Sequence, residues 1–222
     1  MLIAAGHWLT ARCGLPLILS DLGASAGLNL LWDQYGLHVG DTSFGPADPT
    51  LTLTPDWEGS LPPQRAPQIL GRAGVDLNPL DPVTDRLRVL AYLWPDQPDR
   101  LARTIAALDL AARSPPAITR SGAATWLARR LQTRFPGALH LIFHTIAWQY
   151  FPPATQARGR ALMAAAGAGA TADTPLARLA MEADATPGSA ALTLTLWPQG
   201  ETIPLGRADF HGRWVRWTAP PP

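Results

Sequence analysis

Residues 15–35 carry the clearest change of hydrophobic period in the chain. An apolar run, Leu17-Ile18-Leu19, leads into Asp21, and small residues fill the positions from Gly23 to Gly27. Beyond them, apolar side chains recur at spacings of i, i+3, i+4 and i+7, at Leu28, Leu31, Trp32 and Tyr35. A continuous apolar run favours a buried strand, and the second spacing favours an amphipathic helix. We therefore predict a strand over 15–21, a tight turn, and a helix over 26–35.

The alternation of apolar runs and helical spacings continues to about residue 181. We predict helices at 1–12, 81–94 and 98–112, a further helix that begins at 121, and another that ends at about 166. We predict strands at 69–76, 117–119, 138–143 and 176–181. Further strands then follow one another directly, at 190–197, 201–207 and 213–218. Residues 36–72 are rich in Gly, Pro, Asp and Thr, with short alternating segments. They predict an inserted β-hairpin, anchored to the body of the protein by Trp57.

This order of elements predicts an α/β fold: a mostly parallel sheet flanked by helices, with antiparallel C-terminal strands and the inserted β-hairpin. In open sheets of this kind, ligands bind outside the carboxyl ends of the strands. That edge would bring together four segments with chemistry-bearing residues, at 21–27, at Asp76, at 121–122 and at 144–150. We take this convergence as the main argument for a binding site.

Composition narrows the class of protein. The chain has 222 residues, of which 47% are hydrophobic and 16% charged, and this balance favours a single globular domain over 1–222. The net charge of +1 gives no electrostatic reason to expect nucleic acid as a partner. Cys13 is the single cysteine, so no internal disulfide can form. No apolar run reaches membrane-spanning length and no basic leader precedes the first apolar residues, which predicts a cytoplasmic protein without membrane contact.

The turn at 21–27 fits two chemical motifs and one plain structural interpretation. Asp21, Gly23 and Gly27 match the acid-x-Gly-x-x-x-Gly turn of methyltransferases that use S-adenosylmethionine. Residues 23–27 also read G-x-S-x-G, the nucleophile elbow of α/β-hydrolases, with Ser25 as nucleophile. The third possibility is a strand-to-helix turn that uses small residues for close packing. The esterase is the least favoured, because a nucleophile elbow normally follows several strands that build the oxyanion hole, whereas this turn follows the first.

Asp76 ends the second predicted strand, where nucleotide-binding α/β folds place an acid for the ribose hydroxyls. A carboxylate suits this role because it accepts two hydrogen bonds from a vicinal diol. The distance from the glycine turn, about 50 residues instead of the usual ~20, would be explained by the insertion at 36–72. The alternative is that Asp76 caps the next helix.

The histidines do not predict a metal site. His140 and His144 have the i, i+4 spacing of a helical zinc pair, but they lie on a predicted strand, where four residues span ~13 Å. His144 ends that strand and is a candidate general base, or else a hydrogen-bonded histidine inside the rim. Trp148 and Tyr150 line a substrate pocket or belong to the core of the next turn. We interpret Arg100, Arg103 and Asp109 as the solvated face of a helix.

Five strings, in this order, carry a resemblance to a known family: LGASAGLNLLWDQY, GVDLNPLDP, WPDQPDRLAR, FHTIAWQYFPP and HGRWVRW. Together they resemble the bacterial family termed domain of unknown function 2332, over almost the whole chain. That family looks like a Rossmann-like class I methyltransferase domain, usually with a helical region before the glycine turn, which here would lie upstream of residue 1.

The resemblance implies S-adenosylmethionine as cofactor and a set of residues to hold it. The residues so implied are Asp21, Gly23, Ala24, Ser25, Gly27, Asn29, Asp76, Leu77, Asn78, Ser121 and Gly122. Gly23 to Gly27 would face the methionine part, Asp76 the ribose, and Leu77 or Asn78 the adenine. The chain departs from the pattern at Gly122, where such enzymes often have an acid for the adenine amino group.

The leading hypothesis from the sequence is an S-adenosylmethionine-dependent methyltransferase that acts on a small molecule, with His144 as a possible base. The alternative is a non-catalytic nucleoside- or cofactor-binding module on the same fold, and the serine esterase with Ser25 is less favoured. Nothing in the sequence predicts an oligomeric state.

Overall fold

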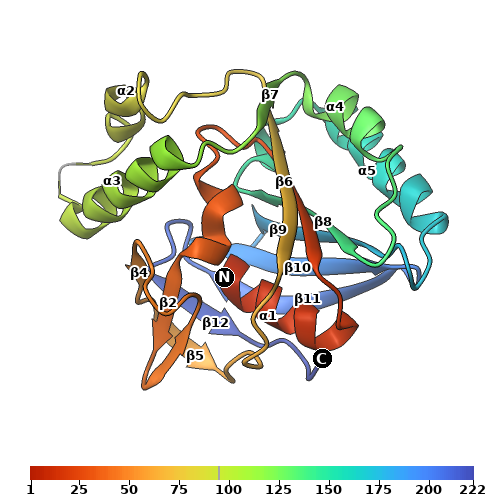
Figure 1. The fold of residues 1–222 in the computed structure, drawn as a ribbon, viewed down its shortest axis with the longest axis horizontal. Helices are drawn as coiled ribbons and strands as arrows, with labels where there is room; N and C mark the ends of the chain where they lie inside the picture. Colours follow the sequence, from red (N-terminus) through yellow and green to blue (C-terminus); the bar gives the residue numbers. More distant parts are fainter. Residues whose placement is uncertain (95) are drawn as a thin grey trace.

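The parallel half of the molecule contains the strands that the sequence predicts up to residue 181. The computed structural model describes residues 1–94 and 96–222 (Figure 1). In this part of the chain, five parallel strands lie in the order β7-β6-β1-β8-β9. They are β1 (Leu17–Leu22), β6 (Ile69–Asp76), β7 (Ile118–Arg120), β8 (Leu139–Thr145) and β9 (Leu176–Ala183). Since all five run in one direction, their carboxyl ends meet at one edge of the sheet.

The other half of the same sheet is largely antiparallel. Next to β9 lie β10 (Ala190–Trp197), β11 (Glu201–Ala208) and β12 (Trp214–Trp217), each antiparallel to the strand before it. In β10 buried and partly exposed residues alternate strictly, as expected for a strand with one face toward the core. The prediction of antiparallel C-terminal strands is confirmed, and the protein is a mixed α/β structure with a large, mostly parallel sheet flanked by helices.

Helices cover both faces of the sheet (Figure 1). On one face, α1 (Leu2–Cys13), the 3₁₀ helix η1 (Leu28–Gln34) and α3 (Pro98–Arg113) share the larger hydrophobic core with alternate residues of β1 and β8, such as Leu19 and Leu141. On the opposite face, α4 (Ala123–Arg130) and α5 (Pro153–Ala168) enclose a second core that includes Leu22 and Ile142. The two-residue period of a strand therefore assigns neighbouring residues of β1 and β8 to different layers.

The insertion does contain a β-hairpin, but residues 42–44 and not 51–54 form its second strand, and the last part of the insertion joins the main sheet. The strands β2 (Gly36–Val39) and β3 (Thr42–Phe44) pair antiparallel, and β4 (Thr52–Leu53) adds to β2 in parallel. The strand β5 (Asp56–Gly59) pairs in parallel with β12 at the edge of the large sheet. The ring of Trp57 lies 6.0 Å from that of Trp217, which confirms its predicted role as an anchor.

Two predicted helices are shorter than the hydrophobic pattern suggested. The segment 26–35 forms only η1, because Gly27 takes a left-handed conformation (φ 73°) and β2 begins at Gly36. The segment 81–94 contains only α2 (Arg86–Leu90), since Asp81 accepts hydrogen bonds from the amides of Val83 and Thr84 and so forms a turn.

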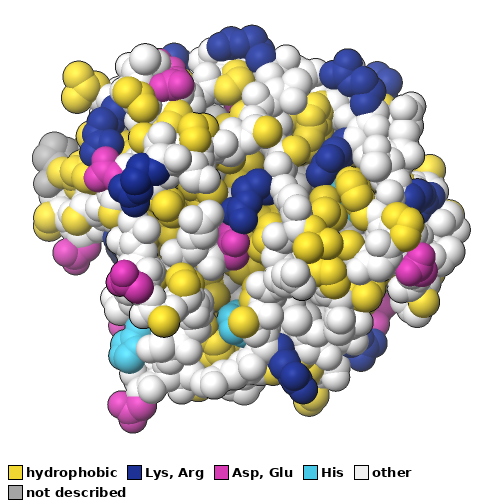
Figure 2. Space-filling model, in the orientation of Figure 1, with side chains coloured by type: hydrophobic (Ala, Val, Ile, Leu, Met, Phe, Trp, Pro, Cys, Tyr) yellow, Lys and Arg dark blue, Asp and Glu magenta, His cyan; other side chains and the backbone are white. Residues whose placement is uncertain are grey.

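Two further observations concern partners. No helix of the described residues is long and apolar enough to cross a membrane. On the face shown in Figure 2, the Arg side chains are scattered and interspersed with acidic and hydrophobic ones. This face carries no continuous basic surface of the kind that binds nucleic acid.

Candidate functional site

The turn between β1 and η1 requires its glycines for backbone geometry and for packing. Gly23 has φ 84° and Gly27 has φ 73°, values that side chains rarely allow. A Cβ atom on Gly23 would lie 2.7 Å from that of Ala147, and one on Gly27 would lie 2.3 Å from the ring of Pro116. Ala24 is buried against Gly74 of β6. Close packing therefore explains both glycines without a ligand, and the case for a site rests on the neighbouring polar groups.

Asp76 joins the end of β6 to this turn. Its Oδ2 accepts a hydrogen bond from the amide of Ser25 (2.9 Å), and its Oδ1 accepts one from the amide of Asn78 (2.8 Å). A carboxylate has about four acceptor positions, so each oxygen keeps one for a further donor. Asp76 is thus fixed by the backbone on one side and still able to accept a pair of hydroxyls on the other.

The end of β7 completes the same edge. The amide of Ser121 donates to the carbonyl oxygen of Asp76 (3.0 Å), and Arg120 donates to the side chain of Asn78 (3.1 Å). Leu77 is 72% exposed beside them. Gly122 is the residue that precedes α4, and the nearest atom to a Cβ built on it is Thr125 Oγ1 at 4.0 Å. The structure thus brings together the cofactor-binding residues expected from β1, β6 and β7, with open space where an acid is expected.

Asp21 is the most unusual group of this edge. It is 2% exposed, and no hydrogen bond from a described residue reaches its carboxyl, on which only burial and the charge of Asp76 act. Burial, with the negative charge of nearby Asp76 adding to it, raises the pKa of the Asp21 carboxyl to about 8. A buried carboxyl without a partner is costly, since its charge is not compensated by any contact. Such a group is a candidate for binding a cationic ligand.

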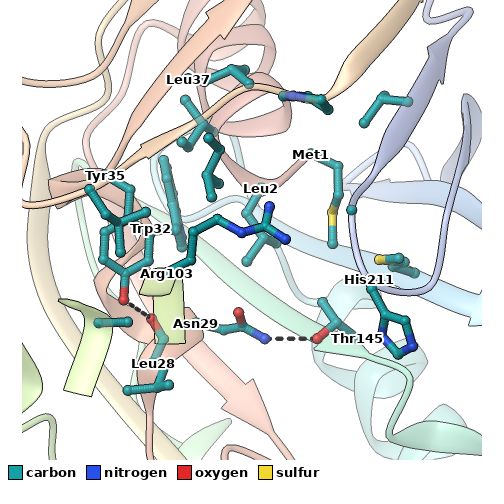
Figure 3. Close-up of a pocket in the computed structure, with 18 of the residues that line it drawn as sticks. Met1, Leu2, Leu28, Asn29, Trp32, Tyr35, Leu37, Arg103, Thr145 and His211 are labelled. Carbon is teal, nitrogen blue, oxygen red and sulfur yellow. Dashed lines mark hydrogen bonds between the residues drawn. The ribbon is translucent and has the colours of Figure 1, made fainter. Parts of the chain in front are cut away.

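Next to this edge lies a cavity of about 500 Å³. Asn29 of η1, which follows the glycine turn, and Thr145 at the end of β8 both line it, and they are joined by a hydrogen bond of 2.8 Å (Figure 3). Its other walls come from α1, the insertion, α3, β9 and the loop before β12, and most are apolar, including Leu2, Trp32, Leu37, Met181 and Phe210. The volume is within the range of ~300–1,000 Å³ that is typical of small-molecule sites.

The cavity also contains two arginines that the sequence predicted on a solvated helix face. Arg100 and Arg103 of α3 line it, and Figure 3 shows the side chain of Arg103 extending into it between Trp32 and His211. Asp109, the third member of the predicted solvated face, instead pairs with Arg86 (2.6 Å). The prediction failed for the arginines because the loop at 209–212 and η1 fold over this part of α3, contacts that helical spacing does not reveal.

His144 lies on the other face of β8, in what we call the closed cluster: His144, Trp148, Arg178 and Glu182. His144 Nδ1 lies 2.6 Å from Glu182 Oε1, and Arg178 donates to His144 Nε2 from two nitrogens, at 3.0 and 3.1 Å. Since Arg178 has only donors, Nε2 is the acceptor and Nδ1 carries the proton. Burial is the main cause that lowers the pKa of His144, so the ring is neutral.

The closed cluster changes the role that we assign to His144. Both of its ring nitrogens are engaged, its side chain is fully buried, and its ring stacks on Trp148 at 4.8 Å. Glu182 also accepts from the amides of Ala147 and Trp148 (3.1 and 3.0 Å). The geometry therefore does not favour a general base here, and it assigns His144 to fixing the loop after β8.

The three residues predicted to form the substrate pocket do not line the cavity. His144 and Trp148 are buried in the closed cluster, and Tyr150 is 75% exposed. Successive residues of a strand point to opposite faces, so Thr145 reaches the cavity and His144 cannot. His211 does line the cavity. Its signal in the sequence was weak, because it stands in a loop whose position depends on distant contacts.

The two other chemistries weighed from the sequence find no assembled site. Among the described residues, no histidine is hydrogen-bonded to the Ser25 hydroxyl, and His140 is instead bonded to Ser20 (2.8 Å). Ser25 is exposed with φ 51°, and its amide is held by Asp76. In the part of the chain that the structure describes, no group of three or more His, Cys, Asp or Glu residues could hold a metal ion.

Comparisons with known proteins identify a family for this chain. Residues 1–217 match a family described as an uncharacterized protein conserved in bacteria, DUF2332. The match covers nearly the whole chain, so this protein belongs to that family, as the five sequence strings indicated. No curated protein and no solved structure matches.

Proposed function

We propose that this member of the DUF2332 family binds S-adenosylmethionine at the edge formed by the carboxyl ends of β1, β6 and β7, which we call the cofactor edge. It would transfer the methyl group to a small molecule in the cavity. The observation that carries the proposal is Asp21, a buried carboxyl without a partner in the described residues, directly beside the glycine turn and Asp76. The free-energy cost of burying this carboxyl is offset if it forms an ion pair with a bound cation, and the α-ammonium group of the cofactor is such a cation.

The residues fit the rest of the cofactor at two of three positions. Asp76 keeps acceptor positions for the two ribose hydroxyls, and exposed Leu77 offers an apolar surface for adenine. The third position, Gly122, provides no acid for the adenine amino group. The strand order β7-β6-β1-β8-β9 supports the finer assignment of a Rossmann-like class I methyltransferase fold, because such open sheets bind nucleosides at this edge.

The cofactor would supply an activated methyl group, and the work of this chain would be to orient an acceptor and exclude water. Asn29 and Thr145 connect the glycine turn to the cavity, so an acceptor held there lies beside the cofactor edge. In place of His144, His211 is the histidine that faces the cavity. Burial, together with the charge of Arg100, lowers the pKa of His211, which leaves its neutral ring able to accept a proton.

A second candidate is a module that binds a nucleoside without methyl transfer. Gly122 favours it, because loss of the adenine contact would weaken the cofactor's affinity. Turnover separates the two candidates: formation of S-adenosylhomocysteine from S-adenosylmethionine, in the presence of an acceptor, supports the transferase and excludes the module.

The first test is calorimetric titration with S-adenosylmethionine and S-adenosylhomocysteine. We expect micromolar binding by the wild type and a loss of at least ~10-fold in Asp76→Ala, because the ribose hydroxyls lose a charged acceptor. Asp56→Ala, which removes an exposed aspartate from β5, is the matched control and should bind as the wild type does. Absence of binding by the folded wild type, or equal loss in both variants, would refute the proposal.

A further inference from the structure

We infer that the cavity is built for a small amphipathic anion, a molecule with an apolar body and one carboxylate or similar group. As the identity of a methyl acceptor, this inference rests on the proposed function. As a statement about what the cavity binds, it depends on the cavity alone. Its basis is a combination of apolar walls with cationic groups that the protein itself does not neutralise.

The charge within the cavity has one sign. Arg100 and Arg103 line it, and no carboxylate is among the described residues that do so. In the described part of the chain, neither arginine takes part in an ion pair. The cavity therefore contains positive charge that no acid of its own walls balances.

The two arginines also repel each other. Burial, and then the charge of Arg103, lowers the pKa of Arg100, and Asp209 opposes this only in part. Asp209 is itself committed elsewhere, since it accepts from Arg213 at 2.8 Å and from the amide of His211 at 2.9 Å. Two like charges beside an apolar cavity are unfavourable unless an anion joins them, and guanidinium groups bind carboxylates through paired hydrogen bonds.

The apolar walls define the rest of the ligand. Leu2, Trp32 and Leu37 are almost fully buried within the main core, so the wall that they form is fixed by packing. Figure 3 shows Arg103 between this wall and the side of Thr145 and His211, so an anion at the guanidinium places its apolar part against Trp32 or Leu2. A ligand of this shape buries its hydrocarbon surface and pairs its charge in one site.

The test uses two carboxylates and their neutral amides: octanoate with octanamide, and 4-phenylbutyrate with 4-phenylbutanamide. Each pair has the same apolar body, so the ratio of the two affinities measures recognition of the charge. By calorimetry on the full chain without cofactor, we expect at least one carboxylate to bind ~10-fold more tightly than its amide. Arg103→Met keeps an unbranched apolar side chain and should reduce this ratio to about one.

Arg113→Met is the matched control, since Arg113 lies on the same helix, is exposed and does not line the cavity. It removes the same charge and should leave the ratio unchanged. Equal affinities for carboxylate and amide, no binding of either carboxylate by the folded wild type, or equal effects of the two substitutions would overturn the inference. Titration of S-adenosylhomocysteine in the same samples keeps the proposals separate, because the charge preference does not require the cofactor to bind.

Discussion

His144 and Thr145 are neighbours in β8, but their side chains lie on opposite faces of the sheet. The two faces differ in how far their polar side chains are paired within the protein. On the side of His144, the closed cluster pairs most of its polar atoms within the protein: Glu182 Oε1 accepts from the histidine and from two backbone amides, and Arg178 donates to the histidine. Among the described residues, Glu182 Oε2 is the atom of this cluster that is buried without a partner. On the side of Thr145, the cavity and the adjoining cofactor edge hold the side chains of Arg103 and Asp21, which have no hydrogen-bond or ion-pair partner among the described residues.

The difference shows where to look for function in this molecule. A buried polar group that is paired within the protein contributes to stability, and one that is left without a partner lowers it. Proteins retain such costs mainly at functional sites. By this criterion His144, whose two ring nitrogens are both hydrogen-bonded, is structural, and Asp21 and Arg103 are the functional candidates.

The largest expected effect comes from breaking the closed cluster. Glu182→Ala removes the acceptor shared by His144 and two amides and leaves the half-buried Arg178 nearby, and we expect a loss of about 3 kcal/mol in the free energy of unfolding. Glu201→Ala, which removes the exposed partner of Arg12 (3.6 Å), should cost less than ~1 kcal/mol. Urea denaturation of both variants measures the contrast. Similar small losses in the two would show that the closed cluster is not stabilising.

At Asp21, on the other face of the sheet, we expect a substitution to raise the free energy of unfolding instead of lowering it. The Asp21 pKa of about 8 in the folded protein lies above the ordinary value of 3.8, so the folded state holds its proton more tightly than the unfolded state. The contribution of Asp21 to the free energy of unfolding therefore falls as the pH rises from about 4 to about 8, and it levels off above that. Asp21→Asn removes this cost.

We expect Asp21→Asn to be more stable than the wild type by roughly 1–3 kcal/mol at pH 8 and by less at pH 5. The same variant should lose S-adenosylmethionine binding by ~10-fold or more, since an amide cannot pair with an ammonium group as a carboxylate does. Thermal unfolding at both pH values, with calorimetry, measures the two effects, and Asp56→Asn is the control. A variant that is less stable at pH 8 would mean that Asp21 is ionised and stabilised, and the argument for an orphan acid would fail.

Local patterns in the sequence predict one of these regions better than the other. The cofactor edge follows from the topology: Asp21, Asp76 and Ser121 each lie at the end of a parallel strand, and parallel strands end at one edge. The strand period also assigns His144 and Thr145 to opposite faces. Which face holds the cavity depends on α3 and on the loop at 209–212, so neither the role of Arg103 nor that of His211 is visible in local spacing.

The bounds and type of the helix predicted at 26–35 were wrong for a related reason. The apolar spacing of 26–35 is helical, but the left-handed conformation at Gly27 and the start of β2 limit it to a 3₁₀ helix. The spacing is satisfied all the same, because Trp32 packs on Gly6 of α1, where a Cβ atom would lie 2.2 Å from its ring. Hydrophobic spacing therefore reports which residues are buried more reliably than which helix type they adopt.

The smallest effect is expected from Gly122→Asp, which adds a polar group where the cofactor edge lacks one. Gly122 precedes α4 with φ −68°, and the atom nearest to the position of an added Cβ lies 4.0 Å away, so Gly122→Asp introduces no clash. Asp and Asn both serve as helix N-caps, and each should stabilise the protein by a few tenths of a kcal/mol relative to Gly. The carboxylate of Asp would also accept a hydrogen bond from the adenine amino group, which should raise the affinity for S-adenosylhomocysteine by roughly 3–10-fold. Gly122→Asn, with the same cap and a weaker acceptor, should gain less. If both variants bind as the wild type does, the adenine does not lie at the end of β7, and the cofactor edge is confined to β1 and β6.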